Sequence, residues 1–417
     1  MSSRYSMDVK PLSQKLSDSI PIEIHEYIIS HVDSTSTLKN CSLTCRAWLR
    51  ASWRNLFSQR RIVVDRTNFE SFLEFIELDS LSVTIIRFIR SLHIEQGESW
   101  LLYRSTGPRN PKTFQFDDYL QRLVGLVSVK SLRLGGIRRD IGPPTIAALR
   151  HNFAGVSVLE IHSVVLASAE QFLDILSSFP SLSGLVLGGV AIDSLSEVQC
   201  THDSLHTLLP PHTPPVPTTL TELVCNLPQD ETIFLFSWLT LHGTVSIRKL
   251  NVTLIHELSN AAVSKYLRDV GPSVEELTIG SADIILPDDF TLSPCVMLST
   301  LGISVQFRSR SNVLNLGVPP AECFIPLIKI LQTISAKQLK EVNIWLRPNG
   351  HMAQEQYEQL DWDGLASVIE QPLFKSLFRF RFFASSKHVE IVKRVIKKRI
   401  WEEHPLLAPV VRVRAWG

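Results

Sequence analysis

The sequence predicts an α/β protein in which a small helical bundle at the N-terminal end precedes a solenoid of parallel strands and helices. Three observations support this fold class. Residues 16–57 carry apolar side chains at helical spacing, a short phrase of the form x-Leu-x-Leu recurs from residue 90 onward, and helical patterns fill the intervals between its copies. Strands that alternate with helices at a nearly fixed period must run parallel, so successive units stack into one continuous core.

Composition places the 417-residue chain among globular proteins long enough for more than one domain, with 44% hydrophobic and 20% charged residues. A net charge of +1 favours neither a nucleic-acid nor a membrane partner, and we expect neither. The apolar stretch 232–241 has about half of the ~20 residues that a membrane-spanning helix needs. Because the first residues are polar, we expect a cytoplasmic or nuclear protein, and the six cysteines fit reduced thiols.

The bundle is expected to contain two or three helices behind a polar, flexible segment at residues 1–15. Pro21 suits a first helical turn, and the motif Asp33-Ser34-Thr35 suits the end of one helix and the cap of the next. Apolar side chains recur at about four-residue intervals in the first helix. They are Ile20, Ile24, Ile28, Ile29 and Val32. The buried positions expected in the second helix are Leu38, Cys41, Leu43 and Cys45, and a third helix continues through Trp48, Leu49, Trp53, Leu56 and Phe57.

Two parts of this segment together resemble an F-box. The Ile20-Pro21 pair is followed two residues later by Glu23, and Ser42-Leu-Thr-Cys-Arg-Ala-Trp48 is similar to the run that ends the family pattern. The resemblance covers about 40 of the 417 residues. The chain departs from the family with Ile20 in place of Leu, with His25 in place of an aliphatic residue and with Thr44 in place of Val.

The resemblance implies a partner, because F-box domains bind the Skp-type adaptor of cullin-RING (SCF) ubiquitin ligases and join it to the cullin. Carried over position by position, the contact or core residues would be Ile20, Pro21, Ile24, Ile28, Leu43 and Trp48. A core of ~40 residues is marginal alone, which agrees with surplus apolar surface. The alternative is that the same residues only pack against the domain that follows.

Residues 58–87 are expected to form a bridge with a short strand at 60–64 and an amphipathic helix at 68–78. The solenoid is expected at 88–383. Its phrase centres on Leu92, Leu132, Leu159, Leu185, Leu223, Leu250, Leu277, Leu301, Val342 and Phe378. Five of the nine intervals run from 24 to 27 residues, which is typical of leucine-rich repeats. The region resembles the degenerate leucine-rich-repeat regions that often follow an F-box.

Helices are expected between the strands at 144–153, 169–179, 230–241, 260–270, 322–334 and 362–370. The longer intervals coincide with insertions at 97–118, 202–219 and 306–320, which are either binding loops or unselected loops. Residues 384–417 are expected to hold a capping helix and a tail. The basic helix 388–400 suits a cap on the last repeat, with a solvated cationic face favoured over an anionic ligand.

No motif in the sequence indicates catalysis. Glycine-rich phosphate loops, nucleophile elbows and paired zinc motifs are absent, so we expect neither an enzyme nor a cofactor. Cys41 and Cys45, with His25 and His31 nearby, allow a zinc site, but buried small side chains are favoured. Asp361 and Asp363 have the spacing of helix-start residues. Ubiquitin ligation would need no catalytic residue here, because the adaptor contributes proximity.

Alternation along the strands selects the candidate substrate contacts. Side chains between the inward apolar positions point to the exposed sheet face, and these are Arg133, Glu160, Asn251, Thr278, Asn343 and Trp345. The leading hypothesis is therefore a substrate-recognition adaptor of an SCF-type ligase that binds an unknown protein substrate. The alternatives are a scaffold whose F-box-like bundle no longer recruits a ligase, and an enzyme built on the loops at the strand ends.

Overall fold

The structure is a computed structural model. It describes residues 19–58, 60–77, 85–96, 120–139, 141–196, 215–241, 246–254, 257–281, 290–308, 324–349 and 354–416. The segment 1–15 and most of the three predicted insertions lie outside these residues.

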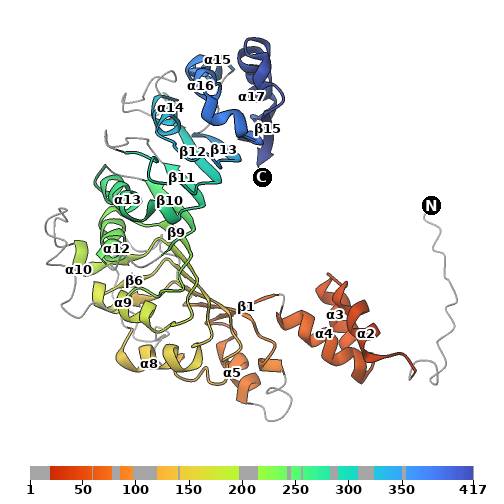
Figure 1. Ribbon diagram of the computed structural model, residues 1–417. Helices are drawn as coiled ribbons and strands as arrows, with labels where there is room; N and C mark the ends of the chain where they lie inside the picture. The colour runs from red at the N-terminus through yellow and green to blue at the C-terminus, as the bar shows by residue number, and fades with distance from the viewer. Residues whose placement is uncertain are drawn as a thin grey trace.

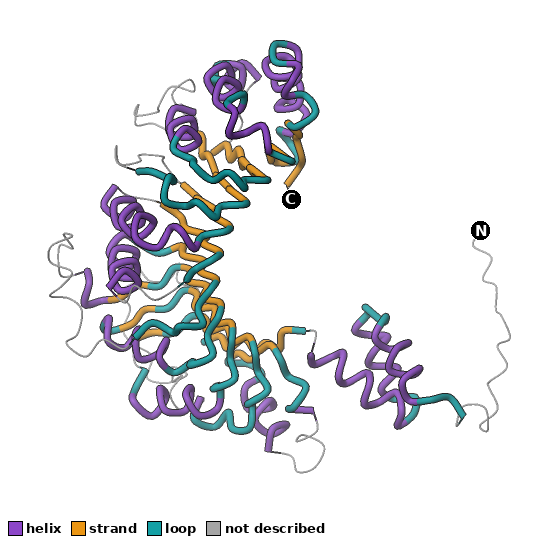
Figure 2. The backbone as a smooth tube through the Cα atoms, in the orientation of Figure 1, coloured by secondary structure: helices purple, strands orange, loops and turns teal. Residues whose placement is uncertain are grey.

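The chain forms a small helical bundle and a curved α/β body (Figure 1). The bundle consists of α2 (Ile22–Ser30), α3 (Thr35–Ser42) and α4 (Arg46–Ser58). Figure 2 shows the strands of the body along the inner side of the curve and most helices along its outer side. The bundle has its own small core, whereas a single core runs through the body from Val64 to Val411.

All neighbouring strands of the body are parallel. The twelve-stranded sheet contains β1 (Arg61–Asp65), β2 (Ser91–Glu95), β3 (Ser131–Gly135), β5 (Val158–His162), β7 (Gly184–Gly188), β9 (Glu222–Asn226), β10 (Lys249–Leu254), β11 (Glu276–Ser281), β12 (Thr300–Arg308), β13 (Glu341–Asn349), β14 (Arg379–Ser385) and β15 (Val411–Trp416), in that order. The α/β class and the parallel sheet predicted from the sequence are confirmed.

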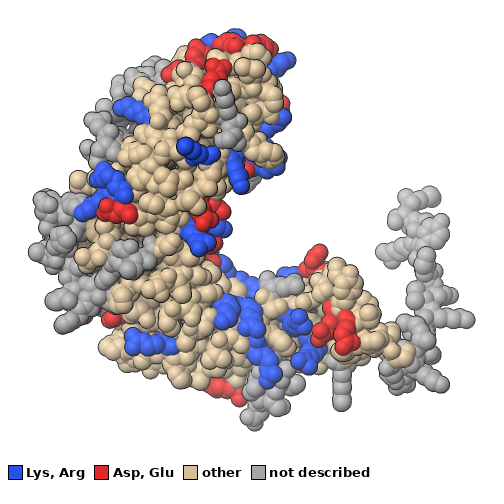
Figure 3. All heavy atoms as spheres, viewed as in Figure 1, with Lys and Arg blue, Asp and Glu red and all other residues tan. Residues whose placement is uncertain are grey.

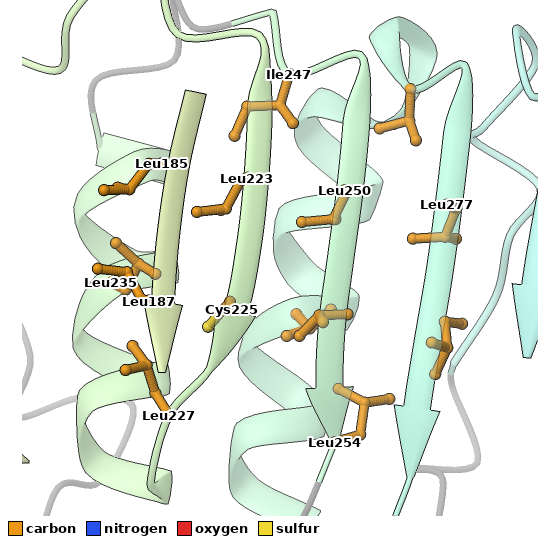
Figure 4. Close-up of a cluster of buried hydrophobic side chains, with 14 of the residues drawn as sticks. Leu185, Leu187, Leu223, Cys225, Leu227, Leu235, Ile247, Leu250, Leu254 and Leu277 are labelled. Carbon is orange, nitrogen blue, oxygen red and sulfur yellow. The ribbon is translucent and has the colours of Figure 1, made fainter. Parts of the chain in front are cut away.

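The helices that follow the strands are α5 (Phe69–Glu77), α8 (Pro143–Asn152), α9 (Ala169–Ser177), α10 (Asp193–Ser196), α12 (Gln229–Leu241), α13 (Glu257–Val270), α14 (Ile325–Gln332), α15 (Gln354–Glu358), α16 (Trp362–Ile369) and α17 (Val389–Ile396). Their apolar sides face the sheet because each strand presents a buried Leu-type position to them. The central residues Leu185, Leu223, Leu250 and Leu277 stand side by side in register (Figure 4).

One hydrogen-bond pattern repeats at the start of the strands. The carbonyl of the residue before a strand accepts from two consecutive N–H groups of the next repeat. Lys130 O accepts from the N–H groups of Ser157 and Val158, and Ser157 O accepts in the same way from Ser183 and Gly184. The pattern continues to Lys340 O, which accepts from Phe378 and Arg379. It fixes each repeat one strand spacing from the last, whatever the length of the connection between them.

The last copy of the predicted phrase is centred two residues too early. Val342 is opposite Phe380, not Phe378, and Phe378 is 70% exposed ahead of β14. The Phe-Arg-Phe-Arg-Phe run gives several equivalent ways to place the phrase, and only the neighbouring strand selects one.

The sheet also extends beyond the predicted solenoid boundaries of 88 and 383. β1 lies in the predicted bridge, and β15 lies in the predicted tail. The helix α17 packs Val389, Val392 and Val395 into the common core and is followed by β15, which forms the edge of the sheet. The basic helix is therefore part of another repeat unit, and β15, not the helix, forms the edge of the sheet.

A second, three-stranded sheet runs beside the first, formed by β4 (Arg138–Arg139), β6 (Val165–Leu166) and β8 (Ala191–Ile192). The chain reaches each of these strands through a residue with positive φ. These residues are Gly136 (66°), Ser163 (53°) and Gly189 (61°). Ser163 is the only non-glycine residue with positive φ in the described part of the chain. Its Cβ makes this backbone conformation costly.

We predict that Ser163→Gly stabilises the protein by about 1 kcal/mol, because it removes the cost of a Cβ in the left-handed region. The measurement is the free energy of unfolding in urea. Gly189→Ala is the matched reverse change, since a Cβ there would lie no closer than 3.8 Å to any neighbouring atom. It should destabilise by a similar amount. Equal stability of all three proteins would contradict the conformational argument.

Candidate protein-interaction surfaces

Helix α2 is apolar on two sides. Its inner side places Ile29 in the bundle core, where the Asn55 amide of α4 donates to Ile29 O at 2.6 Å. Its other side leaves Ile24 47%, Tyr27 65% and Ile28 46% exposed. A helix that serves only its own bundle needs a single apolar stripe. The second stripe is surface that the described chain leaves uncovered.

His25 departs from the F-box pattern that residues 16–57 resemble, and in the structure it has a hydrogen-bond partner. His25 is buried, and the Trp48 indole Nε1–H donates to His25 Nδ1 at 2.7 Å. Because an indole N–H can only donate, the imidazole must present an unprotonated nitrogen. The pair joins α2 to α4 across 23 residues of sequence. His25 can therefore occupy a position where the F-box pattern has an aliphatic residue, because its ring accepts a hydrogen bond from Trp48.

Of the six residues predicted to contact the adaptor or form the core, one packs on the bundle core and five lie outside it. Trp48 is half-buried and packs against the bundle core. Ile20 is half-buried at the start of α2, and Pro21 is exposed as its N-cap. Ile24, Ile28 and Leu43 are exposed. The structure places all but Trp48 outside the bundle core.

The prediction that Leu43 and Cys45 are buried is wrong, since Leu43 is 84% exposed and Cys45 is exposed. Helix α3 ends at Ser42, so the helical spacing that would align Cys45 with Cys41 no longer applies, and Leu43, two residues after Cys41, does not share its side of the helix. The hydroxyl of Thr44, another departure from the F-box pattern, donates to Asn40 O at 3.1 Å. Ser34 caps α3 as predicted by accepting from Thr37 N.

The inner face of the curved sheet is the second candidate surface. In Figure 3, Lys, Arg, Asp and Glu side chains occur along the hollowed side of the body. The register brings Arg133 opposite Glu160, and Asn251 opposite Thr278. Asn251 is exposed and Thr278 is half-buried. Two residues before Asn251 on β10, the Lys249 ammonium pairs with Glu222 (3.3 Å) and Glu276 (3.7 Å).

At the N-terminal end of this face, Glu160 is the centre of a charge cluster. Its carboxylate pairs with Arg61 and, at 3.7 Å, with Arg133, and it lies 3.8 Å from His162 Nε2. Burial, followed by the positive charge of Arg133, lowers the pKa of His162, and Glu160 opposes this effect. Burial and Arg133 lower the pKa of His93 in the same way. Both imidazoles therefore resist protonation in the folded state.

Asn343 is wrongly predicted as an accessible contact, because it is only 7% exposed. Its amide donates to Glu341 Oε1 at 2.9 Å, and the large side chains Trp345 on its own strand and Arg381 on the next crowd it. Trp345, predicted to lie on the exposed sheet face, is half-buried and stacks on Phe383 of β14, with ring centroids 5.4 Å apart.

Several inner-face residues at the C-terminal end were missed from the sequence. They are Glu341, Arg347, Arg379, Arg381, Phe383, Arg412, Arg414 and Trp416. Placing the phrase on Phe378 and treating residues 401–417 as a tail removed β14 and β15 from the register. The available signal was the alternation Val-Arg-Val-Arg at 411–414, which is typical of a strand with one buried face.

The carboxylates around the start of α16 hold structural partners. Asp361 caps this helix by accepting from Gly364 N at 2.9 Å, which confirms it as a helix-start residue. Nearby, Glu358 accepts from Gln354 at 2.8 Å. Within the described residues, no three His, Cys, Asp or Glu side chains are grouped so as to hold a metal ion.

No protein-family model matches the chain, and a search of curated proteins finds no relative. Among the described helices, none is both long and apolar enough to cross a membrane.

We predict that Arg133→Met raises the pKa of both His93 and His162, because methionine keeps the bulk but removes the positive charge. In the wild type, the lowered pKa values mean that the unfolded chain binds more protons as the pH falls through about 6.5. These two groups therefore stabilise the fold above this pH and lose that contribution below it, and the loss should be smaller in the variant. NMR titration of the imidazole protons is the measurement. Arg150→Met on α8 is the control, and unshifted histidines in Arg133→Met would contradict the charge argument.

Proposed function

We propose that the protein is a substrate-recognition adaptor of an SCF-type cullin-RING ubiquitin ligase. The helical bundle would bind the Skp-type adaptor, and through it the cullin, while the inner face of the solenoid would bind a protein substrate. The chain would supply no catalytic group of its own and would act in the cytoplasm or nucleus. The resemblance of residues 16–57 to an F-box supports this proposal.

The single observation that carries the proposal is the uncovered apolar side of the bundle. Ile24, Tyr27 and Ile28 are exposed on one side of α2, and Ile22 in its first turn and Leu43, which follows α3, are exposed as well. Isolated exposed apolar residues are ordinary, but several on one short helix mark an interaction site. Three of the five, Ile24, Ile28 and Leu43, are positions that the family resemblance assigns to the adaptor contact.

A second feature that supports the proposal is the way the bundle joins the body. Phe57 at the end of α4 stacks on Phe75 of α5 with centroids 6.4 Å apart, and the Arg60 guanidinium donates to Asp33 O at 2.7 Å. These contacts hold the bundle against the first repeat. An adaptor that works by proximity needs such a fixed connection between its partner-binding and substrate-binding parts.

We predict that the double variant Ile24→Asp/Ile28→Asp loses capture of a purified complex of Skp-type adaptor and cullin by about a hundredfold or more. Burying two unpaired carboxylates in an apolar interface costs several kcal/mol. Because both positions are exposed, the bundle itself should fold normally, which circular dichroism and thermal unfolding would show. The measurement is binding of the full-length chain by biolayer interferometry.

Leu258→Asp is the matched control, since Leu258 is similarly exposed but lies on α13 of the solenoid. It should bind like the wild type. Equal capture by the double variant and the control would overturn the docking side of α2. A wild-type chain that captures no adaptor would overturn the ligase proposal and leave a scaffold role for the solenoid.

A further inference from the structure

The last three strands carry a concentrated set of arginine and aromatic side chains on the inner face. The register places Trp345, Phe383 and Arg414 in one row across β13, β14 and β15, and Ser385 is opposite Trp416 in the next. We call these side chains, together with Arg347, Arg381 and Arg412, the arginine–aromatic surface. All lie on the side of the sheet away from Val342, Phe380 and Val411, which face the helices.

The aromatic rings form an ordered platform. Trp345 and Phe383 are stacked with an interplanar angle of 16°, and the Arg347 guanidinium lies over the Trp416 ring, 5.6 Å from its centroid. On the other side of Trp345, Gly302 makes room for the indole. A Cβ at residue 302 would lie 2.6 Å from the Trp345 ring. The Trp345 and Phe383 rings therefore stack on each other across the two strands, and both remain half-exposed.

The charges on this surface are unbalanced. Glu341 pairs with Arg381 at 3.0 Å and more distantly with Arg379 at 3.9 Å. Arg347, Arg412 and Arg414 are exposed and have no ion-pair partner in the described part of the chain. Arg412 donates only to backbone carbonyls, including Ala408 O at 2.7 Å. Elsewhere on the inner face, Arg61 and Arg133 share the carboxylate of Glu160, and Lys249 pairs with Glu222 and Glu276.

We propose that the arginine–aromatic surface binds an acidic peptide segment that carries an aromatic or large aliphatic side chain. The exposed guanidinium groups would pair with carboxylates, and the apolar side chain would lie on the Trp345–Phe383 platform. Guanidinium groups match carboxylates in geometry, and tryptophan and arginine are the residue types that contribute most at protein interfaces. This peptide class would be the substrate class of the proposed ligase adaptor, so the inference rests on the proposed function.

The same surface is less suited to a nucleic acid. The unpaired arginines lie on β13 and β15, which are only about 10 Å apart at the usual strand spacing. Further along the inner face, a phosphate backbone would meet the carboxylates of Glu341, Glu276 and Glu222, each on a different strand. A short acidic segment fits the limited extent of the positive charge.

The test uses the full-length chain without any ligase component and a fluorescein-labelled dodecapeptide of Asp and Glu with one central Phe. Fluorescence anisotropy should show that Arg347→Glu/Arg414→Glu weakens binding by about a hundredfold, as two lost charge-assisted contacts imply. The matched control Arg150→Glu/Arg122→Glu makes the same charge change on exposed residues outside the surface. It should weaken binding less than about threefold, an effect of net charge alone.

Three outcomes would overturn the proposal. One is equal loss in the control variant, which would show that net charge alone governs binding. Another is equal binding of a peptide with Gln and Asn at the acidic positions. The third is tighter binding of a single-stranded oligonucleotide of the same charge, which would assign the surface to nucleic acid.

The failure of this proposal and of the ligase proposal can be told apart. Arg347→Glu/Arg414→Glu should still capture the Skp-type adaptor, and Ile24→Asp/Ile28→Asp should still bind the acidic peptide. Loss of both activities in either variant would mean that the two surfaces are not independent, and this result would count against the proposal made here.

Discussion

The structure depends on the hydrogen bonds by which one backbone carbonyl at the start of a repeat accepts from two N–H groups of the next. These bonds set the register of nearly every strand pair before any side chain is considered. Once the register is set, all central apolar residues face the helices and all intervening residues face the inner side. Connections of very different length are tolerated, because extra residues leave this hydrogen-bond pattern unchanged. The inner face is therefore regular even though the repeat length is not.

The helical bundle follows a different principle. Its core contains few fully buried side chains, among them Ile29 and Leu38, and two hydrogen bonds, His25–Trp48 and Asn55–Ile29, join α2 to α4. Specific polar contacts hold the helices in place and leave apolar residues for the outside. A larger aliphatic core would have needed Ile24 and Ile28 inside. The core is small and the surface is apolar for the same reason, which is that Ile24 and Ile28 lie outside the core.

Sequence reasoning was accurate where a pattern had room to repeat. The phrase centred on Leu132, Leu185 or Leu250 recurs along the chain with helical patterns between its copies, and this predicted the parallel sheet. The alternation of side chains within each copy predicted the inner face. It failed where the local pattern was ambiguous. Phe378 and Phe380 are equally apolar, and only pairing with β13 distinguishes them. Leu43 lies two residues after Cys41 and five after Leu38, spacings that point away from their side of α3, and the helix ends one residue before it. The exposure of Asn343 depended on the sizes of neighbours on other strands, which alternation does not describe.

Only two residues separate the end of α4 at Ser58 from the start of β1 at Arg61. The bundle therefore has little freedom to swing, and the distance from it to any point on the inner face is a property of the fold. Twelve strands at the usual spacing place β15 roughly 50 Å along the sheet from β1. Each repeat then corresponds to a step of about 5 Å. The distance between a ligand on the inner face and a partner of the bundle is therefore set by the strand to which the ligand binds. Gain or loss of one repeat would change this distance without changing either binding surface.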